Sequence, residues 1–194
     1  MAAVLASGSC GEIRRKDADI SSAQREVEPH EKEVFGAVEQ DKWEEVVEIY
    51  KTNPSSSTTI NQVRDTILYP AILMGKQEGV IKLLTLVEKQ DKERMENLVQ
   101  TPNKWGNTPL HQAAFRGMDK VCSFIANHNC TEKVVCCLND QKETPLHVAV
   151  LHGRKQTFFA LQMVIEANGW RAEECNTRGD SMLHSAIARE HFGE

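Results

Sequence analysis

The chain lacks a long apolar run and is poor in aromatic residues. Aromatic side chains make up 6% of its 194 residues, and 18 consecutive apolar residues occur nowhere. A helix that spans a membrane needs about 20 such residues, so we expect no membrane insertion by this chain itself. The first residues also lack the basic segment that precedes the apolar part of a secretory signal peptide.

A cluster of basic residues is missing as well. The formal net charge is −5, and the Lys and Arg residues are interspersed with Asp and Glu. Proteins that bind nucleic acid usually carry a basic stripe or patch, so nucleic acid is not an expected partner. Hydrophobic residues make up 40% and charged residues 26% of the chain, which is close to the composition of ordinary globular proteins.

The sequence also lacks a recognisable catalytic pattern. It has no glycine-rich phosphate loop, no nucleophile motif of the Ser, His and Asp type, and no defensible pair of catalytic carboxylates. We therefore expect a protein that is not an enzyme and that needs no cofactor.

The six cysteines and seven histidines do not follow a metal-binding pattern. Cys136 and Cys137 are adjacent, which suits neither a disulfide nor a C-x-x-C zinc site. Free thiols behave as small apolar side chains and indicate a reducing compartment, here the cytoplasm. His111, His147 and His184 recur at one position of a repeated motif, so they cannot converge on one ion. We expect no metal, and we expect each ring to bond to the backbone of an adjacent turn.

What the chain does contain is an internal repeat. Residues 108–111 read Thr-Pro-Leu-His, and the same four residues recur 36 positions later, at 144–147. An altered third copy, Ser-Met-Leu-His, occupies residues 181–184. A Thr-Pro-Leu-His core at a period of about 33 residues is the signature of the ankyrin repeat, whose paired helices stack on their neighbours. Such a stack forms a binding surface and not a catalytic pocket.

Each residue of the motif has a physical task. Thr108 is predicted to cap a helix that begins at Pro109, where the missing N–H costs nothing. Leu110 is predicted to face the core, and Gly117 suits the left-handed residue that ends the helix. A second apolar helix returns through residues 121–125 at helical spacing.

The predicted fold class is all-α: an ankyrin-repeat solenoid of about five helix-turn-helix units, the last one truncated. We expect a disordered or partly helical leader over residues 1–30 and the repeat domain over residues 31–194. The expected units are residues 31–57, 58–99, 101–139, 140–177 and 178–194. In the second unit Pro70 lies inside the first helix, where we expect a distortion. The fifth unit has a first helix only, so we expect a fragment or a truncated product.

The surface that we expect to bind a partner is concave. It combines the turn that precedes each motif with the exposed side of each first helix. The predicted turn residues are Lys104, Trp105, Asn107, Gln141, Lys142, Glu143, Arg178 and Asp180. The predicted wall residues are Gln112, Phe115, Arg116, Val148, Leu151 and His152. Trp105, beside a cation, is either an anchor of an interface or a residue that only packs on the next turn.

The sequence of the repeats is similar to that of one plant group. The segments 43–54, 106–111, 142–147, 151–153 and 176–188 resemble plant ankyrin-repeat proteins of the accelerated-cell-death type. This resemblance covers about residues 31–194. It implies a cytosolic ankyrin domain that precedes a membrane domain in full-length members, and a role in stress, salt and defence signalling. That membrane domain is not part of this sequence, and Tyr69, Ser181 and Met182 depart from the repeat pattern.

Two functions remain as hypotheses. The first is a non-enzymatic protein–protein interaction module that binds a protein partner of unknown identity through its concave surface, in plant stress or defence signalling. The second is a fragment of the cytosolic regulatory domain of a multi-helix membrane protein. We expect a cytoplasmic location, at the cytosolic face of a membrane if a downstream membrane domain exists.

Overall fold

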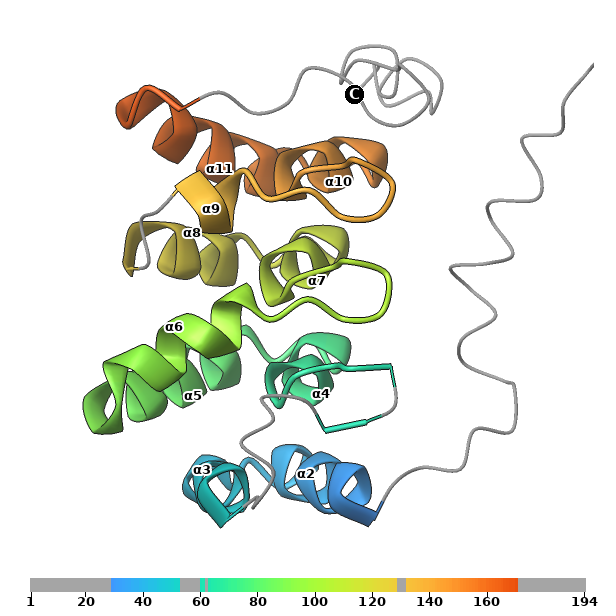
Figure 1. The fold of residues 1–194 in the computed structure, drawn as a ribbon, viewed down its shortest axis with the longest axis vertical. Helices are drawn as coiled ribbons and strands as arrows, with labels where there is room; N and C mark the ends of the chain where they lie inside the picture. The colour runs from blue at the N-terminus through green and yellow to red at the C-terminus, as the bar shows by residue number, and fades with distance from the viewer. Residues whose placement is uncertain (1–28, 53–59, 62, 129–131, 171–194) are drawn as a thin grey trace, which may run out of the picture.

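The helices are stacked in two columns along the long axis of the molecule (Figure 1). The structure, a computed structural model, describes residues 29–52, 60–61, 63–128 and 132–170. The first helices of four pairs are α2 (Pro29–Glu39), α4 (Leu68–Leu73), α7 (Pro109–Arg116) and α10 (Pro145–Leu151). The second helices are α3 (Trp43–Thr52), α5 (Gln77–Gln90), α8 (Asp119–His128) and α11 (Lys155–Ala167). First helices pack on first helices and second helices on second helices, so one hydrophobic core runs through the stack.

The all-α solenoid expected from the sequence is confirmed, and the described residues contain no strand. Of the expected leader over residues 1–30, residues 1–28 lie outside the described residues, and residues 29 and 30 already belong to α2. The fifth unit from residue 178 also lies outside the described residues. The predictions for Arg178, Asp180 and His184 lie there too. The boundaries between the units stay predictions.

The motif residues begin and end the helices as predicted. Thr144 Oγ1 accepts a hydrogen bond from the N–H of His147 at 3.2 Å, and Pro145 is the first residue of α10. Gly117 ends α7 with φ 73° and ψ 33°, a left-handed conformation that a residue with a Cβ adopts only at a cost.

The second repeat differs from the expected pair of helices because it contains a third one. The additional helix, α6 (Lys92–Gln100), is capped by Asp91, whose Oδ1 accepts the N–H of Arg94 at 3.1 Å. Met95, Leu98 and Val99 are buried and attach α6 to α5 and α7. Three apolar residues among charged ones make too short a pattern to stand out in the sequence. A further short helix, α9 (Glu132–Val135), precedes the fourth repeat.

Pro70 does not interrupt α4, contrary to the expected distortion. It is the third residue of a helix that begins at Leu68. The first amides of a helix have no partner within the helix, so a proline in this turn removes no hydrogen bond.

Candidate partner-binding surface

Three turns that precede first helices share one geometry, built around an asparagine. We call the described residues within 61–65, together with residues 103–107 and 139–143, the finger turns. Asn103 Oδ1 accepts the N–H groups of Trp105 and Asn107, both at 3.0 Å. Asn61 and Asn139 make the same two bonds, to the residues two and four positions further on, at 2.9 to 3.1 Å. Each asparagine therefore closes its turn as a rigid loop.

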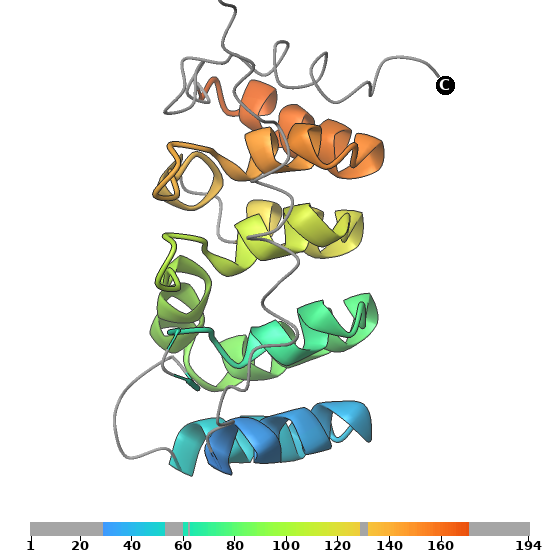
Figure 2. The ribbon, with the colours of Figure 1, turned by 90° about the vertical axis from the view of Figure 1, so that its right-hand side faces the viewer.

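The finger turns lie beside one another along the stack (Figure 2). The N–H of Lys104 donates to the carbonyl of Val63 at 2.9 Å, and the N–H of Asp140 donates to the carbonyl of Trp105 at 3.2 Å. Backbone bonds thus join each turn to the next one. The fourth residue of each turn has a positive φ: 62° at Arg64, 75° at Gly106 and 60° at Lys142.

Side chains join the turns a second time. Asn103 Nδ2 donates to Asp65 Oδ1 at 3.3 Å, and Asn139 Nδ2 donates to Asn107 Oδ1 at 3.0 Å. Gln112 Nε2 reaches back from α7 to the same oxygen of Asp65 at 3.1 Å. Gln112 and Asn107, both expected to face a partner, are therefore engaged within the protein and half-buried.

Glu143 was expected on the surface of its turn, and this prediction is wrong. The residue is 6% exposed, and its carboxylate accepts Asn139 Nδ2 at 3.3 Å. Its backbone carbonyl lies 3.0 Å from Nε2 of the buried His111. The neighbouring repeat covers Glu143, so this residue stabilises the turn and does not face a partner.

His111 connects the third repeat to the fourth, as the motif predicts. Its Nδ1 accepts the N–H of Thr108 at 3.2 Å. A carbonyl oxygen can only accept, so Nε2 must donate to Glu143, and the ring is neutral with its proton on Nε2. Burial lowers the pKa of His111 to about 4, against the smaller opposing effect of the bond to Glu143. The turn that would adjoin His147 lies outside the described residues.

The tips of the finger turns carry the residues that remain available to a partner. Lys104, Gln141 and Lys142 are exposed, and Trp105 is half-buried. Lys104 Nζ lies 4.5 Å from the centre of the Trp105 ring, a cation–π contact. We call these four residues the finger tips.

An apolar strip lies at the carboxyl ends of the first helices. Phe115 of α7 and His152, which follows α10, meet edge to face with ring centres 4.4 Å apart. Leu73 and Met74, at the end of α4, are 40% and 38% exposed. We call these four residues the concave wall. Val148 and Leu151 were expected to be part of it, but they are 6% and 7% exposed, so that expectation of exposure is wrong. Val148 belongs to the hydrophobic core.

Arg116 is exposed, and its side chain also bonds to the preceding repeat. Its Nη2 donates to the carbonyl of Leu73 at the end of α4. Arg154 Nε donates to the carbonyl of Phe115 at 3.0 Å, and Lys76 Nζ to that of Val38 at 2.9 Å. Three successive repeats therefore place a cation at the carboxyl end of the preceding first helix, where unpaired carbonyls and the helix dipole favour positive charge.

Sequence reasoning missed the asparagines that hold the finger turns. Asn61, Asn103 and Asn139 each stand five residues before the threonine position of their motif. This constant offset was the signal that could have identified them.

The described residues offer no site for a metal ion. No three His, Cys, Asp or Glu side chains among them are placed to hold one. Cys122, Cys136 and Cys137 are free thiols. Burial, with smaller effects of Glu132 and Cys137, raises the pKa of Cys136 to about 11, so this thiol stays protonated. None of the described helices combines the length and apolar character required to cross a membrane.

A family model described as ankyrin repeats in three copies matches residues 75–168. The chain carries ankyrin repeats. The matched range holds the two most complete motifs and the second and third finger turns. Ankyrin repeats indicate a protein–protein interaction module, and the generally non-enzymatic character of this fold agrees with the lack of a catalytic pattern.

Two curated proteins are similar to part of these repeats. An ankyrin repeat domain-containing protein, SAT10, from Stachybotrys chartarum is 28% identical over 126 residues. The human transient receptor potential cation channel subfamily A member 1 is 41% identical over 56 residues. The matches cover 63% and 26% of this chain but 6% and 5% of those two proteins, so the chain spans a small part of either. Neither relative is a plant protein.

Proposed function

We propose that this chain binds a protein partner across its finger tips and its concave wall. The proposal depends on one observation. The inner polar groups of each finger turn form hydrogen bonds within the turn and to the neighbouring turn, while the side chains at its tip remain available to a partner. Asn139, for example, bonds to Asn107 and to two amides of its own turn. A partner then meets side chains on a frame that is already ordered, so binding orders little additional backbone.

The composition of this surface suits a protein ligand. Trp105 has a cation–π contact with Lys104 within the third repeat, and Phe115 of the third repeat meets the ring of His152 of the fourth. Tryptophan and other large aromatic side chains concentrate the binding energy of protein interfaces. The described part of the surface has no group of three His, Cys, Asp or Glu side chains placed to hold a metal ion.

We further propose, from the resemblance to the plant group, a place in cytoplasmic stress or defence signalling. Expression of the tagged chain in plant cells tests the location, and its partners test the pathway. The regulatory part of a membrane protein is the weaker hypothesis, since no contact or charge of this surface points to a membrane domain.

Affinity capture with the full chain tests the binding surface. The immobilised protein is exposed to a plant lysate, and captured proteins are quantified by mass spectrometry. We expect the substitutions Trp105→Ala and Phe115→Ala to lower the yield of a common set of partners about tenfold, which corresponds to ~1.4 kcal/mol.

Phe159→Ala is the matched control, because Phe159 is an aromatic residue of α11 that is 62% exposed. It should leave the yield unchanged, and circular dichroism should show all three variants folded. Partners that depend on Phe159 and not on Trp105 or Phe115 would contradict the proposal.

A further inference from the structure

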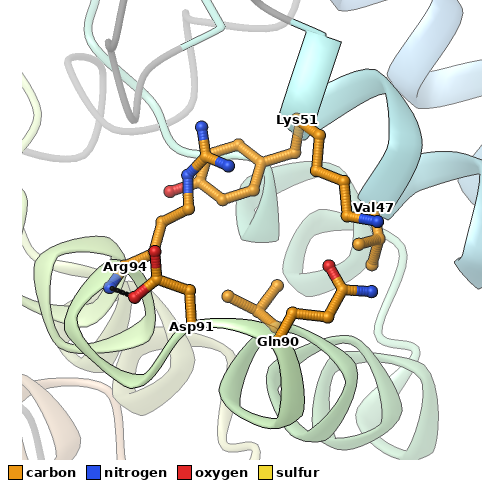
Figure 3. A pocket seen from close by; sticks show the side chains of 7 residues that line it. Val47, Lys51, Gln90, Asp91 and Arg94 are labelled. Atoms are coloured by element: carbon orange, nitrogen blue, oxygen red, sulfur yellow. Dashed lines mark hydrogen bonds between the residues drawn. The ribbon is translucent and has the colours of Figure 1, made fainter.

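A cavity of about 240 Å³ opens between α3, the end of α5 and the start of α6 (Figure 3). Helices α3 and α5 belong to the column of second helices, and α6 extends that column (Figure 1). The cavity therefore lies away from the finger turns. The function proposed above makes no use of it.

The floor of the cavity is apolar and well ordered by packing. Val47 and Val87 are each 2% exposed, and Tyr50 is 3% exposed. All three belong to the hydrophobic core. A ligand would therefore meet two aliphatic side chains and an aromatic ring that do not need to rearrange.

Tyr50 brings a polar atom into this floor. Its hydroxyl is buried and makes no hydrogen bond of full geometry with a described residue. Burial raises the pKa of Tyr50, and the nearby Arg94 guanidinium opposes that rise. A buried hydroxyl without a partner carries an uncompensated desolvation cost. A ligand with an acceptor oxygen in the cavity would remove that cost.

The rim carries more donors than acceptors. The guanidinium carbon of Arg94 lies 4.6 Å from the centre of the Tyr50 ring, and Arg94 makes no ion pair with a described residue. Lys51 Nζ lies 2.6 Å from Glu48 Oε1, and Gln90 adds an amide. The carboxylate of Asp91 is the one negative group of the described rim, and its Oδ1 already accepts the N–H of Arg94. Figure 3 shows Lys51, Gln90 and Arg94 around the opening.

We propose that this cavity binds a carboxylate carried on a short aliphatic chain. The planar carboxylate matches the fork of the Arg94 guanidinium and accepts from Tyr50 and Lys51. The aliphatic part packs on Val47 and Val87. A phosphate dianion is disfavoured, because Asp91 adds like charge at the rim.

The size of the cavity limits the ligand. Pockets for drug-sized molecules have volumes of about 300–1,000 Å³, and this one is smaller. It suits a fragment of a few carbons. Such a carboxylate comes either from the C-terminal residue of a peptide or from a free short-chain acid.

Amide NMR spectra of the full chain test the proposal with two acids as probes. Hexanoate represents the free acid and N-acetyl-leucine represents the peptide terminus; hexanamide and N-acetyl-leucinamide are the matched neutral controls. At least one acid should shift resonances at the end of α3 and around Asp91 saturably. Its amide should bind at least about tenfold more weakly, since a hydrogen bond to a charged group is the stronger kind.

Two substitutions separate recognition from packing. Arg94→Gln should raise the Kd of the acid about tenfold, and Tyr50→Phe, which keeps the ring, should raise it a few-fold. Arg116→Gln, an exposed arginine of another face, should leave the Kd unchanged. Binding of hexanoate alone assigns the free acid, and binding of N-acetyl-leucine alone assigns the peptide. The proposal is overturned if neither acid shifts these resonances, if the amides bind equally well, or if folded Arg94→Gln binds as tightly as the wild-type chain.

Discussion

The ring of Trp43 lies against the α-carbon of Gly79. A Cβ placed on Gly79 would come within 2.2 Å of the Cη2 and Cζ2 atoms of that ring. Trp43 belongs to α3 and Gly79 to α5, and both residues are buried. The first and second repeats can approach this closely only because Gly79 has no side chain.

We predict that Gly79→Ala lowers the free energy of unfolding by about 1–3 kcal/mol, the usual cost of overpacking. The helix propensity of alanine alone would change stability in the opposite direction, by ~1 kcal/mol. Gly36→Ala in α2 is the matched control, because a Cβ there meets no atom within 4 Å. It should stabilise the protein by about 0.5–1 kcal/mol. Urea titration measures both, and equal effects would contradict the contact with Trp43.

His111 should make stability depend on pH. Its pKa is about 4 in the folded chain, and that of histidine in an unfolded chain is about 6.5. Between these values the unfolded state binds the proton more tightly. The contribution of His111 is therefore fully present above about pH 6.5, and it is lost as the pH falls toward 4, by about 3 kcal/mol at most.

Urea titrations at several pH values between about 7 and 4 measure this dependence. His111→Gln is expected to lower stability overall and to flatten the decrease with falling pH, so the slope and not the absolute stability is the readout. His128→Gln removes an exposed histidine of α8 and serves as the control, which should keep the slope. An unchanged slope in His111→Gln would show that another group titrates.

Asn139 should contribute more to the stability of the protein than its small side chain suggests. It is 7% exposed, and its Oδ1 holds the amides of Gln141 and Glu143. Asn139→Ala leaves these donors without their acceptor, and we expect a loss of about 1–3 kcal/mol. Thermal unfolding measures the loss, and hydrogen exchange should be faster at the two amides.

Two further variants make this test specific. Asn139→Asp keeps an acceptor oxygen but removes the Nδ2 donor and places a second carboxylate beside Glu143. We expect it to be at least as destabilising as Asn139→Ala. Gln141→Ala changes an exposed residue of the same turn and should alter stability by less than about 0.5 kcal/mol. A larger effect of Gln141→Ala than of Asn139→Ala would contradict the assigned roles.

The fold of the third and fourth repeats could be predicted because their determinants are local. In Thr144, Pro145 and His147, the cap, the first helical residue and the ring that bonds to the cap lie within four positions. Pairs such as α7 and α8 follow from this motif and from the apolar spacing behind it. The helix α6 could not be predicted, since its few buried residues are selected by neighbours from three other helices.

The sequence by itself determined that the chain forms stacked helix pairs and where the finger turns stand. Only the tertiary structure decided which predicted binding residues remain exposed. Folding buries Glu143, Val148 and Leu151, and Gln112 bonds to a carboxylate 47 positions away. The cavity beside Tyr50 and Arg94 likewise joins segments that are distant in the chain. Exposure depends on what a neighbour covers, and no local pattern of residues contains that information.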